Sequence, residues 1–269
     1  MPQKLRGVSY YRSFEPDIAA QHMLDIKQHN LNAVMLAVSE ATVTAQTDNI
    51  AKIVSYAKEL GLVVYLNLWS YGRVFGGEAN SLFLEQHPHL SQVSSTLEHL
   101  PAVCINSREF REYITEHIGL LLSSIPGMDG VFLDEPKFVY EYQHIYPNKV
   151  TYTPIEGFAC YCERCRDLFK EEYGYEMPPQ LTQEVREFRQ NQMLKFIKEL
   201  TVAVKQVSHE VKTGVILLPE HPKHGIYEWS SVAKLDSVDI LSIELYPNQP
   251  GEYATRARRV LELSNAHNK

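Results

Sequence analysis

Short apolar runs rich in β-branched residues alternate with longer segments of helical period along almost the whole chain, and this alternation limits the fold more than any other feature. A strand, a helix and a second strand in succession form a parallel sheet with right-handed crossovers. The longest helical segment, Gln183–Val207, places apolar residues three, four or eight apart, which predicts one apolar face. The other predicted helices are Ile50–Leu60, Phe110–Ser124 and Tyr253–Ser264, and the predicted strands are Arg6–Tyr11, Ala33–Val38, Val63–Leu68, Gly130–Leu133, Gly214–Leu218 and Asp239–Leu245.

The alternation favours an α/β fold of the TIM-like (β/α) barrel type, because no Gly-rich phosphate turn follows the first strand. A closed barrel needs eight strands, and the sequence shows six. Two more strands could lie within Phe75–Val103 or Tyr140–Thr182, but we prefer an incomplete barrel of about six strand–helix units. Long excursions then follow the third strand (Phe75–Ile105) and the fourth strand (Val139–Thr182). An open sheet edge predicts a homodimer or a missing C-terminal part.

The composition limits the size of the core and the kinds of partner that the chain can bind. Its 269 residues, 44% of them hydrophobic, suffice for one large core, so we expect a single barrel domain over residues 1–269 with residues 139–182 as an insertion. The formal charge of -7 argues against nucleic acid or an anionic membrane as the main partner. The sequence shows neither an apolar run of about 20 residues nor a secretory signal, so we expect a cytoplasmic protein with no membrane partner.

Polar and aromatic side chains follow the apolar part of every predicted strand. Barrel enzymes build their sites at this carboxyl-terminal rim. Sugars stack their ring faces on Trp and Tyr and bind acidic and amide groups through their hydroxyls, so a small carbohydrate is the expected substrate. The candidate substrate-binding residues are Tyr10, Asn67, Trp69, Tyr71, Glu220 and Tyr246.

The segment GMDGVFLDEPKF is the sharpest signal, because an apolar strand runs directly into Asp134 and Glu135. Adjacent strand residues point to opposite sides, so one acid should face the barrel axis and the other should brace it or face a neighbouring loop. Glycosidic bond cleavage requires one protonated and one ionised carboxyl. Glu135 is the candidate acid, Glu244 is the candidate second carboxylate, and Glu220 competes for the second role. The alternative is that these acids cap helices or bind loop amides.

Three cysteines, Cys160, Cys162 and Cys165, lie within six residues, and the fold could bring Cys104 to them. Four thiolates in a tetrahedron form a closed, structural zinc site, so a structural zinc with four cysteine ligands is the predicted cofactor. Its role would be to pin the insertion after the fourth strand to the excursion after the third. A reduced or redox-active cluster and an iron–sulfur centre are the alternatives.

The stretches VFGGEANSLF, PAVCINSREF, GVFLDEP and CYCERCRDLFKEEYG carry a family resemblance. With Cys104, the later cysteine cluster and a Glu that closes the fourth strand, Val74 to Gly174 resembles the zinc-containing β-galactosidases of glycoside hydrolase family 42 and related uncharacterised barrel glycosidases. The resemblance implies a (β/α)8 barrel, a structural zinc and retaining hydrolysis by two glutamates. It would make Glu135 the acid/base.

The sequence departs from that family at two places. Asp134–Glu135 stands where the family has Asn-Glu, and Glu244 follows the sixth predicted strand, whereas the family takes its nucleophile from the seventh. An Asp-Glu pair is similar to the hexosaminidases of family 20, in which the Asp orients a substrate acetamido group that itself attacks and the Glu is the acid. A catalytically inactive barrel that binds a carbohydrate or a protein through the same rim, or a different enzyme on this fold, are the other interpretations.

Overall fold

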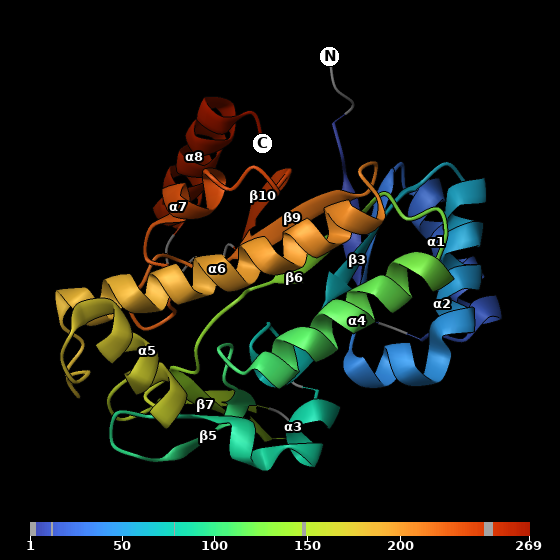
Figure 1. Ribbon diagram of the computed structural model, residues 1–269. Coiled ribbons are helices and arrows are strands. Elements are labelled where there is room, and N and C mark those ends of the chain that lie inside the picture. The colour runs from blue at the N-terminus through green and yellow to red at the C-terminus, as the bar shows by residue number, and fades with distance from the viewer. Residues whose placement is uncertain (1–3, 12, 78, 147–148, 245–249) are drawn as a thin grey trace.

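A parallel six-stranded sheet is the centre of the molecule (Figure 1). The computed structural model describes residues 4–11, 13–77, 79–146, 149–244 and 250–269. The sheet is curled into half a barrel, so the prediction of an α/β, incomplete TIM-like barrel is confirmed. Its strands, in spatial order, are β1 (Gly7–Tyr10), β2 (Ala33–Val38), β3 (Val63–Leu68), β6 (Gly130–Asp134), β9 (Lys212–Leu217) and β10 (Ile240–Ile243).

Each face of the sheet contributes its side chains to a different hydrophobic cluster, because alternate strand residues point to opposite faces. Leu66 and Leu133 are buried in the main core, which lies between the sheet and the helices. Tyr65, Phe132 and Ile216 form a smaller cluster on the other face. The rings of Tyr65 and Phe132 meet edge to face at 5.1 Å. This smaller cluster fills the inside of the curl, where the interior of a barrel would lie.

Side-chain caps mark where four of the helices begin. In each, a Ser or Thr accepts a hydrogen bond from the backbone N–H three residues further along, which satisfies one of the free donors of a helix start; the four are Ser39, Ser81, Ser107 and Thr182. The helices are α1 (Pro16–Gln28), α2 (Glu40–Glu59), α3 (Leu82–Gln86), α4 (Arg108–Ser124), α5 (Glu163–Tyr173), α6 (Gln183–Val207), α7 (Trp229–Ala233) and α8 (Pro250–His267).

Of the four predicted helices, α2 differs most from its predicted bounds, and α1, α3, α5 and α7 were not predicted. The predicted bounds of α6 are those observed, whereas α2 begins at Glu40 rather than at Ile50. Its first part is rich in Thr, Asn and Asp, which have low helix propensity, and the backbone leaves helical geometry at Gln46. The cap at Ser39 and packing against the sheet stabilise a helix that propensity alone does not favour.

Neither long excursion adds a strand to the barrel sheet. The first contains η1 (Tyr71–Arg73), α3, η2 (Pro88–Leu90) and the antiparallel hairpin β4 (Ser91–Val93) and β5 (His99–Val103). The second contains the hairpin β7 (Glu141–Tyr146) and β8 (Lys149–Pro154), followed by α5. Figure 1 shows both excursions on the same side of the molecule.

Among the described residues, β4 pairs only with β5, and β7 only with β8. Within these ranges the parallel sheet therefore has six strands. The two excursions are joined directly by a bridge between Ser94 and Ala159. Of the helices in the described part of the chain, none is long and apolar enough to span a membrane.

Candidate active site

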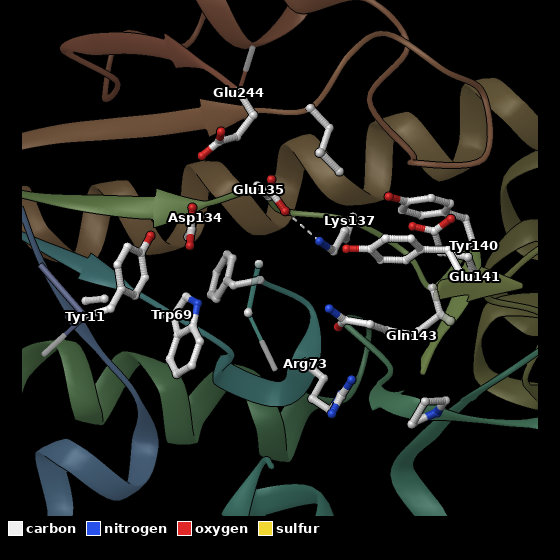
Figure 2. Close-up of a pocket in the computed structure, with 18 of the residues that line it drawn as sticks. Tyr11, Trp69, Arg73, Asp134, Glu135, Lys137, Tyr140, Glu141, Gln143 and Glu244 are labelled. Carbon is white, nitrogen blue, oxygen red and sulfur yellow. Dashed lines mark hydrogen bonds and ion pairs between the residues drawn. The ribbon is translucent and has the colours of Figure 1, made fainter. Parts of the chain in front are cut away.

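A cleft of about 1290 Å³ lies between the carboxyl ends of the strands and the two excursions. Figure 2 shows Asp134, Glu135 and Glu244 near the strand ends, and Glu141 and Gln143 on the hairpin of the second excursion. The cleft is lined by Tyr11, Phe14, Ala37, Thr42, Trp69, Arg73, Phe75, Gly76, Gly77, Pro101, Asp134, Glu135, Lys137, Val139, Tyr140, Glu141, Tyr142, Gln143, Tyr152, Leu218 and Glu244.

Asp134 and Glu135, at the end of β6, both line the cleft although they are only 4% and 9% exposed. The prediction that one of them faces the axis while the other braces it assumed an extended backbone. Glu135 instead has a φ of 42°, in the left-handed region that non-glycine residues rarely adopt, so the alternation of sides ends there. Its carboxylate accepts a 2.7 Å hydrogen bond from Lys137 Nζ, and the two side chains form an ion pair.

Gly76 places backbone directly against these two acids. Its N–H donates to the Asp134 carbonyl at 2.7 Å. A β-carbon at this position would lie 2.8 Å from Glu135 Oε2 and 3.2 Å from Asp134 Oδ2, so the two oxygens are at most about 6 Å apart. The neighbouring Gly77 has a φ of 113° and lies against the ring of Trp69. Only glycine fits this loop without moving the acids or the indole.

The electrostatics of the cleft are set by three carboxyl groups. Burial, followed by the nearby charge of Glu135, raises the pKa of Asp134 to about 7, although Asn67 and Lys137 act in the opposite direction. The pKa of Tyr11 is raised to about 12 by burial and by the charges of Asp134, Glu244 and Glu135. One carboxyl that holds a proton near neutral pH therefore lies beside one that is paired with a lysine.

Four of the residues predicted from the sequence line the cleft together: Asp134, Glu135, Glu244 and Trp69. Asn67 is buried below them on β3 and acts on the Asp134 carboxyl. Tyr246 lies outside the described residues.

Tyr10, Tyr71 and Glu220 are not among the residues that line the cleft. The Tyr10 hydroxyl contacts His22 Nδ1 at 2.8 Å, so the ring packs toward α1 because it lies on the outer face of β1. Tyr71 is fully buried with its ring edge against His117 of α4. Glu220 accepts from the N–H of Trp229 and pairs with Arg259, so it ties α7 to α8.

Several cleft residues were not among the candidate site residues. Lys137, two residues beyond Glu135, and Tyr11, directly after Tyr10, belong to the polar and aromatic groups that the sequence places at strand ends, but neither was assigned a role. Tyr140, Gln143 and Tyr152 come from the β7–β8 hairpin and the residue before it, a segment in which the sequence predicted an insertion but no hairpin.

The four cysteines come together although Cys104 is far from the others in the chain. All four Sγ atoms lie within 4.8 Å of one another, and Cys104 Sγ is 3.6 Å from both Cys162 Sγ and Cys165 Sγ. Sulfurs of a tetrahedral site with Zn–S bonds near 2.3 Å are about 3.8 Å apart, so the cluster fits a metal ion of that kind. Four protein ligands leave no open coordination position, which is typical of a structural site.

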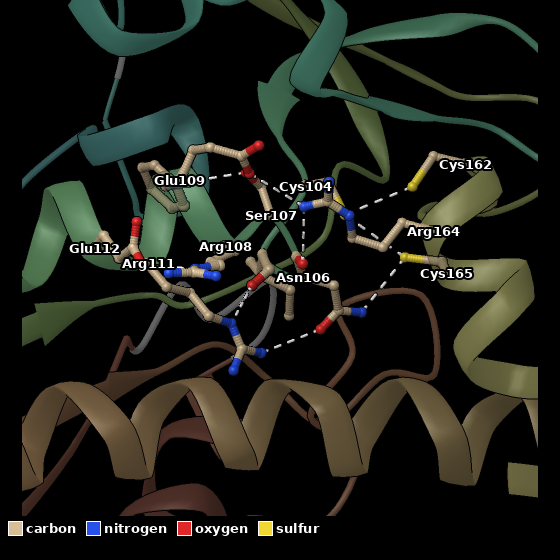
Figure 3. A network of polar contacts seen from close by, with 12 residues as sticks. Cys104, Asn106, Ser107, Arg108, Glu109, Arg111, Glu112, Cys162, Arg164 and Cys165 are labelled. Carbon is tan, nitrogen blue, oxygen red and sulfur yellow. Dashed lines mark hydrogen bonds and ion pairs between the residues drawn. The ribbon is translucent and has the colours of Figure 1, made fainter. Parts of the chain in front are cut away.

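Polar groups around the cluster connect it to both excursions (Figure 3). Asn106 Nδ2 donates to Cys165 Sγ at 3.4 Å, and its carbonyl accepts from Arg164 of α5 at 3.2 Å. Arg111 of α4 donates to the Asn106 side-chain oxygen at 3.1 Å. Such groups around metal ligands orient them and stabilise their charge.

The buried guanidinium of Arg189 links the cysteine loop to the loop after β9. It donates to the carbonyls of Ala159, Pro222 and Lys223 at 2.5, 2.6 and 2.8 Å, and lies 4.6 Å from the Phe138 ring centroid. Burial lowers its pKa to about 9, while the thiolates of the cysteine cluster oppose that effect. The cysteine loop and the loop after β9 are therefore fixed to the same residue.

No family model matches the sequence, and no curated protein matches it either. Among solved structures, the chain is similar to the β-galactosidase of Bacillus circulans sp. alkalophilus, with a TM-score of 0.69 and 14% identity over 97% of this chain and 43% of that one. The β-galactosidase of the Antarctic haloarchaeon Halorubrum lacusprofundi gives a TM-score of 0.68 and 12% identity over 91% and 40%. That of Rahnella sp. R3 gives 0.66 and 16% over 91% and 40%.

The chain thus spans less than half the length of these three proteins. At such low identity the likeness concerns the path of the backbone and not the chemistry of the site. Over the matched part, the chain shares the backbone fold of these β-galactosidases.

Proposed function

We propose that this chain is a glycoside hydrolase-like barrel that cleaves a glycosidic bond of a small carbohydrate in the cleft. The observation that carries the proposal is the gathering of three carboxyl groups, those of Asp134, Glu135 and Glu244, with Tyr11 and Trp69 at one edge of the sheet (Figure 2). Acid-assisted cleavage needs one protonated and one ionised carboxyl group in the same site. Aromatic rings can stack against the apolar faces of a sugar.

In this proposal Glu135 is the general acid/base and Glu244 the second carboxylate. Glu135 transfers a proton to the glycosidic oxygen while the bond from that oxygen to the anomeric carbon breaks, and the alcohol leaves. If Glu244 attacks the anomeric carbon, a water then displaces it from that carbon and gives its proton to Glu135. If Glu244 instead takes the proton of an attacking water, that water adds its oxygen in the same step, and both carboxyl groups regain their starting protonation by exchange with solvent.

A structural zinc held by Cys104, Cys160, Cys162 and Cys165 is part of the same proposal. When bound, it supplies a crosslink without an open position for chemistry. The cysteines themselves join the end of β5 to the start of α5, so they hold the two excursions that form the outer walls of the cleft.

The decisive experiment measures turnover of a panel of nitrophenyl glycosides by the wild-type chain and by Glu135→Gln. We expect the substitution to leave the fold intact and to reduce turnover at least about a hundredfold, because an amide cannot transfer the proton. Glu163→Gln, an exposed change on α5, is the matched control. Near wild-type turnover by Glu135→Gln would remove Glu135 from the mechanism.

A substrate-assisted reaction of the hexosaminidase type is the second candidate, because Asp134 lies beside Glu135 in the same cleft. Asp134 would then orient an acetamido group of the substrate. This alternative predicts turnover of N-acetylated sugars only, and little effect of Glu244→Gln. If the chain binds sugars and turns over none of the panel, the interpretation as an inactive binding barrel is correct instead.

A further inference from the structure

Lys137 is a cation inside a cleft whose proposed chemistry needs a carboxylic acid. Its Nζ lies 2.7 Å from Glu135 Oε2, and the two side chains are only 20% and 11% exposed. Its backbone N–H donates to the Val74 carbonyl at 2.8 Å, which holds the main chain of Lys137 against the first excursion. A pair this sheltered is screened less than a surface pair, so Lys137 favours the ionised form of Glu135.

Asp134 has a different environment. No ion pair joins it to a cation in the part of the chain that the structure describes. Several titratable or polar groups surround it: Glu135 and Lys137 just beyond its own strand, Asn67 on β3, Tyr11 after β1 and Glu244 after β10. Arg73 and Glu141 lie farther along the cleft (Figure 2). Burial and two neighbouring carboxyl groups therefore both favour its neutral form.

The oxygens of the two carboxyl groups are at most about 6 Å apart in a sheltered site. Both groups do not ionise readily, because the second negative charge is repelled by the first. We propose that Asp134 and Glu135 hold a single proton between them and that Lys137, by pairing with Glu135, places this proton on Asp134 in the free protein. Lys137 is then a positioning residue for the proton.

The catalytic consequence rests on the proposed function. Glu135 becomes an acid only when its pair with Lys137 opens, so the substrate must offer the ammonium group another oxygen, such as a sugar hydroxyl. The proton of the pair then passes from Asp134 to Glu135 and on to the glycosidic oxygen. A raised pKa of Asp134, about 7, agrees with a proton stored on that residue.

The test follows the carboxyl carbons of the free protein by ¹³C NMR between pH 4 and 9, with Asp134→Asn and Glu135→Gln used for assignment. We expect Asp134 to titrate near pH 7, while Glu135 stays ionised through that step. In Lys137→Met the proton moves toward Glu135, whose midpoint should rise by at least about one pH unit. Lys137→Arg should restore the wild-type distribution, and Lys137→Gln serves if the Met variant does not fold.

The matched control is Lys58→Met. It removes another lysine–carboxylate pair at 2.7 Å, the one between Lys58 and Asp129 at the amino end of β6. It should leave both midpoints unchanged. An Asp134 that is already ionised at pH 5, or a Lys137→Met titration identical to wild type, would overturn the proposal. Because this titration needs no substrate, a failure to find turnover counts against the proposed function alone.

Discussion

At the scale of the single residue, Gly76 determines how close the backbone comes to the two acids. Because it has no side chain, Glu135 Oε2 and Asp134 Oδ2 can lie 2.8 and 3.2 Å from the position that a β-carbon would occupy. Its backbone φ does not lie in the left-handed region, so alanine is compatible with the backbone itself. The constraint at this position is the approach of the carboxyl groups and not the conformation of the loop.

We expect Gly76→Ala to keep the fold and to lose activity. The added methyl group meets the end of a flexible side chain, which can move, so the free energy of unfolding should change by less than about 1 kcal/mol. The displaced carboxyl group should lower kcat at least about tenfold. Thermal unfolding and turnover measured on one preparation check this, and wild-type kcat would show that the carboxyl position is unimportant.

At the scale of the element, the cysteine cluster replaces the packing that short strands and a short helix cannot provide. The hairpins β4–β5 and β7–β8 have two strands each, and such hairpins are marginal alone. Cys104 at the end of one hairpin and the three cysteines at the start of α5 join these elements across the cleft wall. A metal at this place would therefore stabilise both excursions at once.

Cys162→Ser should lower metal content and stability together, because a hydroxyl is a poor substitute for a thiolate ligand. We expect elemental analysis to give well below one metal per chain and the excursions to become sensitive to protease. The exposed Glu163→Gln on the same turn is the control and should keep both properties. Metal content equal to wild type would contradict the proposed site.

At the scale of the whole molecule, a half-barrel has two sheet edges that a closed barrel lacks. In the described residues, β1 and β10 are the terminal strands of the sheet, and Val8 on β1 is 38% exposed. Uncovered edges are templates for pairing with another chain. The expectation of a homodimer that covers an open edge follows from this topology.

Sedimentation of the wild-type chain and of Val8→Lys checks that expectation. We predict a dimer for the wild type and a shift toward monomer for the variant, because a charge on an edge strand opposes edge pairing. Leu120→Lys, at an exposed position of α4, should behave as wild type. A wild-type monomer at micromolar concentration would show that the edge is not an interface.

The sequence by itself determined the six strands of the parallel sheet, four of the helices and the crowding of three cysteines, because periodicity and spacing are local properties of a chain. It also marked Asp134, Glu135, Trp69 and Glu244, since each follows a recognisable strand. Only the tertiary structure decided that Tyr10 and Tyr71 pack away from the cleft and that the β7–β8 hairpin forms part of its wall. Which face of a strand end meets the cleft depends on the backbone turn there and on packing between segments far apart in the chain, and neither leaves a periodic trace in the sequence.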